Sequence, residues 1–586
     1  MASSITTAFL QYPTPTYVLT ASTLGLFLDT TPDAASSVVA ISLLQLHSQH
    51  AHRRQNALRN HIILLLSLSL ATSVAMLGPS LTALSSPAMS IITLYNMSLV
   101  KNTIALLIIQ VNTLLSSRIS ARHATITLFP ALWTSAWYLV ALTSPVGKLF
   151  TWTPASGLER YEWLIPYTGS IAVDWVTSSW ANILTQFVGS WFMGTARKDT
   201  LDEDELIGDL VDAPVSSTSP QAAGSRSLAF GGFLLALTIP SHIWSELPTP
   251  AYSPGMTPFS VGCILPTLAR SKHTRPTLDD YIYESKQYAN RADVLLWPES
   301  AVHFDNPEDR DAAFGQISRE VIGSSVAVSF EETVRDVTKP EGRTAIKRLG
   351  VAIVNKDGVQ AQYFKQHLVP VAESFSIVRW DLPPAIYELP LRAPKGVKSP
   401  DWAPAPKFTR PIPLTMSICL DFAFPTAFTS LTARPSLILA PGRTWHVSIS
   451  RMLLEQTRLR AVEIGSTALW CDAGEESSAN SALSGIVGAQ RREPYQIGRG
   501  SWVQTIGIPY PFDTAGQTLY ARIGSAGGLL VVWLVAISSA HSLMLVGVSS
   551  LGKKRIAAAL GGSWDLVRSS WLHQRAPPVQ EQDLLH

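Results

Sequence analysis

The sequence predicts a helical membrane domain of several spans with an α/β domain inserted into it. Charged residues make up only 15% of the 586 residues, well below the roughly 25% typical of soluble globular proteins. Long apolar runs fill residues 1–245 and return at 523–548. Between them, residues 256–510 carry most of the charge and alternate short apolar stretches with polar turns, which is typical of a layered α/β domain.

Six apolar runs are long enough to cross a bilayer, which takes roughly 20 residues per helix. They are residues 61–79, 88–114, 125–144, 168–194, 228–244 and 523–548. Two shorter runs, 16–29 and 35–48, are weaker candidates, and counting both gives about eight spans, seven of them before the insert. Asp174 lies within one run, where an ionisable group is costly. A position near the interface or a loop end is the favoured interpretation for it.

The charges of the connecting loops predict the sidedness, because short cytoplasmic loops carry an excess of Lys and Arg. Basic residues occupy the loops 49–60 and 115–124 and follow the last span, whereas the loop 80–87 has none. With eight spans and a cytoplasmic N-terminus, the basic loops are cytoplasmic and the insert lies on the exoplasmic (periplasmic or lumenal) side. The acidic segment 198–227 is then a cytoplasmic loop, and 549–586 is a cytoplasmic tail.

Short strands and a helix are expected within the insert. Apolar runs at 259–265, 294–296 and 437–439 predict strands, and the pattern at 453–465 predicts a helix. The three cysteines, Cys263, Cys419 and Cys471, are far apart and lack the paired spacing of a zinc site or a disulfide framework. Cys263 is expected in the core; for Cys471 the core is favoured over a place near the site. No metal or cofactor is predicted, and the net charge of +2 does not indicate a nucleic-acid partner.

Three residues of the insert have the types that nucleophilic catalysis by a thiol requires. Cys419 stands in Ser-Ile-Cys-Leu-Asp-Phe-Ala-Phe-Pro, Glu299 in Leu-Leu-Trp-Pro-Glu-Ser-Ala-Val and Lys365 in Tyr-Phe-Lys-Gln-His-Leu-Val-Pro-Val-Ala-Glu. A thiol needs a base to become a nucleophile, and it needs a cation or N–H donors for the oxyanion formed on a carbonyl substrate. Each residue alone has a simpler interpretation: a surface glutamate, a solvated hairpin lysine and a packed core thiol. Their occurrence together favours a site.

These motifs resemble those of the carbon–nitrogen hydrolase (nitrilase) superfamily, whose Glu, Lys and Cys triad matches Glu299, Lys365 and Cys419. The whole chain resembles the apolipoprotein N-acyltransferase family, a membrane branch with the same insert before its last span. The runs that carry this resemblance are WPESA at 297–301, KQHLVPVAE at 365–373, RAVEIG at 460–465 and TLYARIG at 518–524. The similarity is clear over the insert and rests mainly on topology elsewhere. It implies a four-layer α-β-β-α sandwich for the insert.

The resemblance also implies roles for particular residues. Cys419 would take an acyl chain from a phospholipid as a thioester, Glu299 would be the general base, and Lys365 would stabilise the oxyanion and help to lower the thiol pKa. Glu373 and Asp421 match supporting acidic positions, although Asp421 replaces the usual glutamate, and Trp445 matches a substrate-binding loop tryptophan.

The sequence departs from the family at Gly442-Arg443-Thr444 and Cys471-Asp472-Ala473-Gly474, so acceptor recognition is expected to differ. Abundant Ser, Thr and Pro and the long acidic loop favour a eukaryotic, fungal source.

Three functions remain open on the sequence. The first is a membrane acyltransferase that moves an acyl group from a phospholipid to an amine or a lipoprotein-like acceptor by a ping-pong mechanism. The second is a membrane-anchored amidase in which water resolves the same thioester. The third is a scaffold that kept the fold without catalysis.

Overall fold

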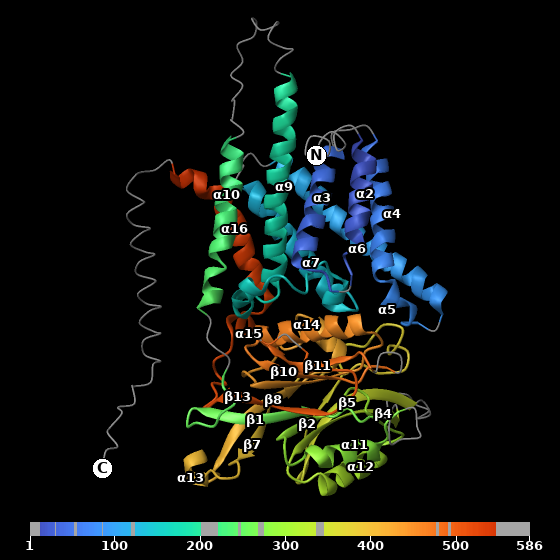
Figure 1. The fold of residues 1–586 in the computed structure, drawn as a ribbon, viewed down its shortest axis with the longest axis vertical. Coiled ribbons are helices and arrows are strands. Elements are labelled where there is room, and N and C mark those ends of the chain that lie inside the picture. The colour runs from blue at the N-terminus through green and yellow to red at the C-terminus, as the bar shows by residue number, and fades with distance from the viewer. Residues whose placement is uncertain are drawn as a thin grey trace, which may run out of the picture.

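The chain folds into a helical part and an α/β part that lie one above the other (Figure 1). The computed structural model describes residues 12–29, 31–51, 56–84, 86–118, 124–200, 221–243, 248–267, 275–335, 345–475, 480–489, 491 and 494–546. The middle of the predicted acidic loop 198–227, the predicted tail 549–586 and much of the basic loops 49–60 and 115–124 lie outside these residues. The sidedness inferred from those loops therefore stays a prediction.

A helix forms at each of the eight predicted spans. They are α2 (Pro13–Gly25), α3 (Ala34–Ala51), α4 (Ala57–Ala75), α6 (Pro87–Arg118), α7 (Ala124–Thr143), α9 (Ile171–Thr200), α10 (Gln221–Ala236) and α16 (Ser525–Val546). Short helices connect them: α5 (Leu77–Leu81), η1 (Gly147–Phe150), η2 (Glu159–Leu164), α8 (Ile165–Thr168), η3 (Ile239–His242) and α15 (Leu519–Ile523).

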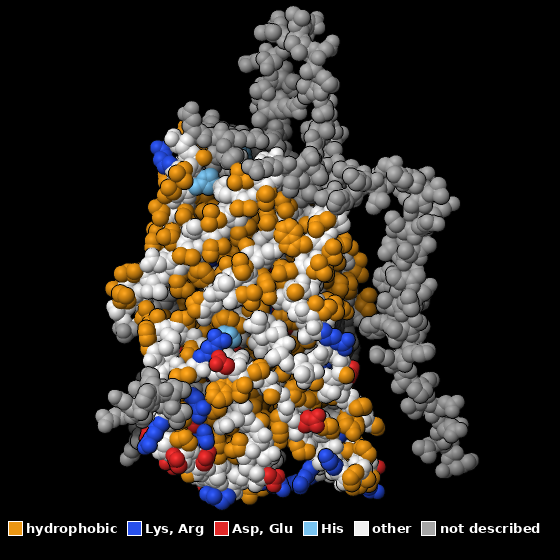
Figure 2. Space-filling view, turned by 180° about the vertical axis from the view of Figure 1, so that it is seen from behind, with side chains coloured by type: hydrophobic (Ala, Val, Ile, Leu, Met, Phe, Trp, Pro, Cys, Tyr) orange, Lys and Arg blue, Asp and Glu red, His pale blue; other side chains and the backbone are white. Residues whose placement is uncertain are grey.

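Three helices among the described residues are long and apolar enough to cross a membrane: Ala57–Ala75, Pro87–Ser117 and Ile126–Thr143. The helices Ser227–His242 and Ser525–Ser538 are apolar but shorter. Hydrophobic side chains cover the surface of the helical part, whereas Lys, Arg, Asp and Glu gather over the α/β part (Figure 2). This surface is what a membrane-embedded helical part would need, and crossing by all eight helices stays a prediction.

Asp174 lies near the start of α9, as the favoured loop-end interpretation expected, but its side chain is buried. It lies in the first turn of α9, and its carboxylate accepts hydrogen bonds from Lys148 Nζ and Thr153 Oγ1, both at 2.6 Å. Both charged side chains of the pair are buried. A buried charge is tolerated when it is paired and hydrogen-bonded, so the ion pair explains how the helical part accommodates Asp174.

The α/β part contains two sheets packed face to face. The first has the order β13-β1-β2-β4-β5-β6, with β3 paired to β4, and the second has the order β12-β11-β10-β9-β8-β7. The first sheet comprises β1 (Met256–Cys263), β2 (Val294–Leu296), β3 (Val302–Phe304), β4 (Ser325–Arg335), β5 (Ala345–Asn355), β6 (Gly358–Phe364) and β13 (Trp502–Pro509). The second comprises β7 (Tyr387–Arg392), β8 (Thr409–Met416), β9 (Leu437–Gly442), β10 (Thr467–Asp472), β11 (Leu483–Gly488) and β12 (Gln496–Ile497). The strands predicted at 259–265, 294–296 and 437–439 are thus confirmed as β1, β2 and β9.

Helices complete the four expected layers. The outer face of the first sheet is covered by α11 (Leu278–Tyr288) and α12 (Pro307–Glu320), and that of the second by α14 (Val447–Glu463), beneath the helical part (Figure 1). The short α13 (Ser399–Trp402) and η4 (Cys419–Ala423) lie in loops. The helix predicted at 453–465 is α14, which begins six residues earlier because His446 caps its N-terminus by accepting a hydrogen bond from Ser448 N. Within the described parallel strands, β1, β2 and β4 end at one edge of the first sheet, and β8, β9 and β10 end at one edge of the second.

Cys263 and Cys471 form a disulfide, which the spacing of the cysteines did not predict. Both residues are fully buried, so the expected core position is confirmed for each. Cys263 ends β1 of the first sheet and Cys471 lies in β10 of the second, and the bond joins the two sheets across the core. The sequence separation of 208 residues hides this pairing, because the two strands meet only in the tertiary structure.

Replacing both Cys263 and Cys471 by alanine is expected to lower the free energy of unfolding by about 2–5 kcal/mol, because the disulfide restricts a long loop in the unfolded chain. Thermal unfolding with and without reductant measures the effect: reductant should lower the midpoint of the wild type and leave the double variant unchanged. Alkylation of the denatured, unreduced wild type should modify Cys419 alone, and modification of all three cysteines would contradict the pairing.

Candidate active site

Glu299, Lys365 and Cys419 come together where the two sheets end. Glu299 follows β2 and Lys365 follows β6, both in the first sheet, and Cys419 follows β8 in the second sheet. Lys365 Nζ lies 2.7 Å from Glu299 Oε1, and the Glu299 carboxylate is hydrogen-bonded to the Cys419 thiol. All three side chains are at least 95% buried, with exposed fractions of 4%, 1% and 4%. The surface glutamate and the solvated hairpin lysine are therefore wrong interpretations of these residues.

The backbone around Glu299 is fixed on both sides. The Trp297 indole N–H donates to Ser285 Oγ at 2.9 Å, and the backbone N–H of Glu299 donates to the carbonyl of Gly442 at 3.2 Å in the other sheet. The next residue, Ser300, has a φ of 52°, in the left-handed region that non-glycine residues rarely adopt. These constraints aim the Glu299 carboxylate at the gap between the sheets.

Lys365 bridges two carboxylates. Its Nζ also lies 2.7 Å from Glu373 Oε1, while Glu373 Oε2 accepts a hydrogen bond from the backbone N–H of Val369 at 2.8 Å. Burial alone would lower the pKa of Lys365, but Glu299 and Glu373 outweigh it and hold that pKa well above its ordinary value. Lys365 is therefore a permanent cation in the site.

Cys419 sits on a sharp turn. It has a φ of 46° and begins the short helix η4 directly after the end of β8. Strained backbone of this kind persists only where the surrounding structure enforces it, and it is common at functional sites. The turn presents the thiol to Glu299 on one side and to the backbone N–H of Arg443 on the other.

The resting thiol is protonated. Burial raises the pKa of Cys419 well above its ordinary value, and the charges of Glu299 and Glu373 raise it further. Lys365 and the Arg443 N–H act in the opposite direction, as the resemblance implied for Lys365, but they do not prevail. Burial also raises the pKa of Glu299. A base with a raised pKa next to a protonated thiol is suited to taking its proton.

Asp421 ties the turn of Cys419 to the segment after Lys365. One oxygen accepts hydrogen bonds from the backbone N–H groups of His367 and Gln366, at 2.7 and 3.2 Å. The other accepts from the Tyr363 hydroxyl at 2.8 Å and from the backbone N–H of Ile418 at 3.2 Å. Asp421 therefore reaches all of these donors although it is shorter than the glutamate usual in the family it resembles. It positions the turn of Cys419 rather than touching the thiol.

The sequence interpretation missed Tyr363 and the role of His367. Tyr363 and Lys365 share one face of the extended chain because they are two residues apart, so the Tyr-Phe-Lys run itself held that signal. His367 Nδ1 lies 3.0 Å from Asp421, and its ring stacks on Phe424 with centroids 3.7 Å apart. No sequence pattern predicts that stacking, because it depends on the turn at Cys419.

Trp445 lies at the boundary with the helical part. Its indole N–H donates to the carbonyl of Pro79 in α5 at 2.9 Å, and the neighbouring His446 lies close to Gly78 of the same helix. This contact connects the loop after β9 to the helical part. Substrate binding by Trp445 stays a prediction.

The helical part, its connection α15 and the helix α14 of the α/β part also brace the turn that carries Cys419. The Tyr520 hydroxyl donates to the carbonyl of Pro425 at 2.8 Å, and Arg460 lies 3.5 Å from that of Phe424. Gly147, with a φ of 55°, packs so closely that a Cβ there would lie 2.5 Å from the Ala423 oxygen. The geometry of the nucleophile thus depends on the docking of the two parts.

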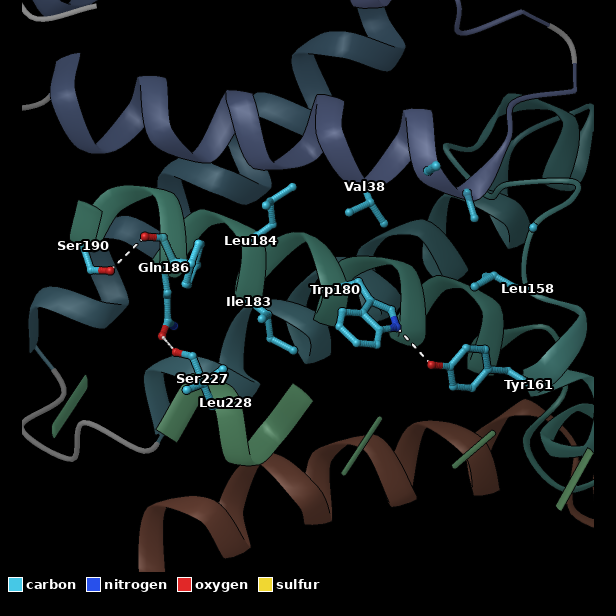
Figure 3. Close-up of a pocket in the computed structure, with 14 residues that line it drawn as sticks. Val38, Leu158, Tyr161, Trp180, Ile183, Leu184, Gln186, Ser190, Ser227 and Leu228 are labelled. Atoms are coloured by element: carbon cyan, nitrogen blue, oxygen red, sulfur yellow. Dashed lines mark hydrogen bonds between the residues drawn. The ribbon is translucent and has the colours of Figure 1, made fainter. Parts of the chain in front are cut away.

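The helical part contains a cavity that is separate from the cluster around Cys419. A cavity of about 460 Å³ opens between α3, α9 and α10, with mainly apolar walls that include Val38, Ile183 and Leu184 (Figure 3). The Trp180 indole N–H donates to the Tyr161 hydroxyl at 3.1 Å on its wall. None of its lining residues belongs to the cluster around Cys419, so we assign it no part in the chemistry.

Replacing Glu373 by glutamine is expected to move the acid limb of the pH–rate profile to lower pH. The base must be ionised, so the rate falls as pH drops through the Glu299 pKa, which burial and then Glu373 raise above the ordinary value of 4.5. Removing the negative charge of Glu373 lowers that pKa. The pH profile of the reaction at Cys419 measures the shift, with Glu388→Gln on β7 as the control; a limb that moves upward would contradict the assignment.

Comparisons with solved structures returned similarities to nitrilase-superfamily proteins. An amidase of the nitrilase superfamily from Nesterenkonia AN1, solved as a cysteine-to-serine mutant, is 20% identical, with a TM-score of 0.30 over 42% of this chain and 90% of its own. Nit3 of Saccharomyces cerevisiae, a member of branch 10 of that superfamily, is 13% identical, with a TM-score of 0.31 over 44% and 92%. The C. elegans NitFhit protein is 14% identical, with a TM-score of 0.28 over 43% and 61%.

No family model matches the sequence. No curated protein matches it either.

Proposed function

We propose that this protein is a membrane acyltransferase of the carbon–nitrogen hydrolase superfamily, similar to the apolipoprotein N-acyltransferases. It transfers a fatty acyl group from a phospholipid to an amine through a thioester on Cys419. The observation that carries the proposal is the buried cluster in which Glu299 contacts both Lys365 Nζ and the Cys419 thiol.

The first half-reaction forms the thioester. Glu299 takes the proton of Cys419, and the thiolate attacks the ester carbonyl carbon of the phospholipid. Lys365 Nζ donates to the oxyanion, and its charge is already in place because its pKa is raised. When the carbon–oxygen bond breaks, Glu299 returns the proton to the leaving oxygen, and a lysophospholipid departs.

The second half-reaction forms an amide. The acceptor amine attacks the thioester carbonyl, Glu299 takes a proton from the nitrogen, and the carbon–sulfur bond breaks. That proton then returns to the Cys419 thiolate, so the enzyme is regenerated. The same cluster thus serves both steps of a ping-pong mechanism.

Two features of the molecule support a lipid substrate on the exoplasmic side. The apolar surface of the helical part would hold the α/β part against a bilayer, where acyl donors are concentrated (Figure 2). The disulfide between Cys263 and Cys471 fits an oxidising compartment, since disulfides are rare in the cytosol. A tag accessible in the 49–60 loop should map to the side opposite the insert, and a tag on the same side would overturn the topology.

The decisive experiment incubates the purified full-length protein with phosphatidylethanolamine carrying a labelled acyl chain. Mass spectrometry should find the acyl group on Cys419, and an added amine should remove it and appear as the amide. No adduct, under conditions where a bacterial apolipoprotein N-acyltransferase labels, would contradict the proposal and favour a scaffold.

A membrane-anchored amidase is the second candidate, because the same residues allow water to resolve the thioester. It would be favoured by a thioester that decays at one rate with and without amines.

A further inference from the structure

A small cavity beside Glu299 is lined by three arginines. Its volume is about 60 Å³, and its walls come from α11 and from the loops that follow β1, β2, β9, β10 and β12. Among its described lining residues, Arg275, Arg443 and Arg499 are basic and Glu299 is the one acidic residue, while much of the wall is apolar or small. We call it the arginine cavity. Its balance of charge favours an anion.

Two of these arginines lie close to the buried hydroxyl of Tyr281. Burial raises the pKa of the Tyr281 hydroxyl, and the charges of Arg443 and Arg499 oppose that rise, so both guanidinium groups lie close to this buried wall residue. The Nη1 atom of Arg499 is buried, and no described atom accepts a hydrogen bond from it. A buried charged donor without an acceptor is costly. An anionic ligand would supply that acceptor.

The arginine cavity adjoins the nucleophile. Glu299 lines it and is hydrogen-bonded to the Cys419 thiol. Arg443 contributes its side chain to the wall, and its backbone N–H donates toward the Cys419 sulfur. A ligand group held by the Arg443 side chain therefore lies close to Cys419, where the acyl carbon of the donor would react.

The size of the arginine cavity restricts what enters it. Its volume is about 60 Å³, and one water needs roughly 10–15 Å³ of such space, so the cavity takes a group of a few heavy atoms. The oxygens of a phosphate fit this space, whereas a long acyl chain does not. Guanidinium groups match phosphate geometry because they donate two parallel hydrogen bonds.

We propose that the arginine cavity binds the phosphate of the phospholipid acyl donor and thereby places the donor's ester carbonyl at Cys419. This inference rests on the proposed function and extends it, because it makes the phosphate a required part of the donor. Glycerol joins the phosphate to the acyl ester, so one lipid molecule reaches both the arginines and the thiol. A neutral diacylglycerol lacks the bound group and is a poor donor.

The test measures the rate of thioester formation on Cys419 by mass spectrometry of the full-length protein, without any acceptor. Three acyl donors are compared: phosphatidylethanolamine, a diacylglycerol with the same chains, and p-nitrophenyl butyrate. Arg443→Gln and Arg499→Gln should each slow acylation by the phospholipid roughly tenfold or more, as expected for loss of a charged hydrogen bond. Acylation by the two neutral donors should not change in Arg499→Gln. Arg319→Gln on α12 is the matched control and should behave as the wild type.

Four outcomes overturn the inference. If both variants are acylated by the phospholipid at the wild-type rate, the arginines do not bind its phosphate. If acylation by p-nitrophenyl butyrate falls by the same factor, the arginines have a structural role. When an amine acceptor is then added to the acylated protein, a loss confined to this transfer step assigns the arginine cavity to an anionic acceptor instead. A wild type that forms no thioester from any phospholipid contradicts the proposed function itself, and the inference fails with it.

Discussion

Replacing Cys419 by alanine is expected to abolish acyl transfer, lowering the rate by on the order of 10⁴-fold or more. In the proposed mechanism a thioester on Cys419 is the intermediate of both half-reactions, and Cys419 is the one free cysteine of the described residues. The side chain is buried on a turn that the segment 363–367 holds through Asp421. No neighbouring thiol can therefore replace it. The measurement is release of labelled lysophospholipid and formation of the amide.

The control is Cys419→Ser, which retains a hydroxyl in the same place. Serine is a much weaker nucleophile than a thiolate at neutral pH, and Glu299 is the one base in contact with it among the residues that the structure describes, so this variant should also be inactive. Both variants should melt near the wild-type temperature and retain the Cys263–Cys471 disulfide. Transfer activity that survives in Cys419→Ala would assign the chemistry to another residue.

Replacing Lys365 by methionine is expected to destabilise the α/β part by about 3–5 kcal/mol and to abolish activity. Lys365 is 1% exposed and forms ion pairs with Glu299 and Glu373, each 2.7 Å from its Nζ. Without the cation, two neighbouring carboxylates remain in a buried site, and breaking a buried pair by removing one partner has a cost of this size. Loss of the hydrogen-bond donor to the oxyanion explains the expected loss of activity. Denaturant unfolding and the thioester assay measure the two effects.

A triple variant separates stability from catalysis. Lys365→Met combined with Glu299→Gln and Glu373→Gln removes the uncompensated charges and should recover most of the lost stability, since the effects of contacting residues are not additive. It should remain inactive, because base and cation are both gone. A triple variant no more stable than Lys365→Met would show that the cost arises from packing rather than from charge.

Alternation and apolar runs were sufficient to predict β1, β2, β9 and α14 and a helix at every apolar segment. Those features are local: a strand buried on both faces and a helix with an apolar stripe each leave their pattern in consecutive residues. The identities of Glu299, Lys365 and Cys419 were likewise readable, since each stands in a distinctive run at the end of a strand.

Contacts between distant segments were beyond reach of the sequence. The spacing of Cys263 and Cys471 gave no sign of their bond, and the buried ion pair of Asp174 was not predicted because its partner Lys148 lies 26 residues away in a separate connection. Only the packing of the two sheets made a disulfide there possible. Only the fold of η1 against α9 brought the lysine to the carboxylate.

Residue type and local pattern thus predicted an apolar helical part, an α/β insert and the three residues of the proposed chemistry, because both are present in short stretches of the chain. The tertiary structure decided their protonation and their neighbours. Burial and two carboxylates keep the Cys419 thiol protonated despite Lys365, Asp421 holds the turn, and Arg443 lies against the sulfur. Such effects depend on distances across two sheets, which no single stretch of sequence specifies.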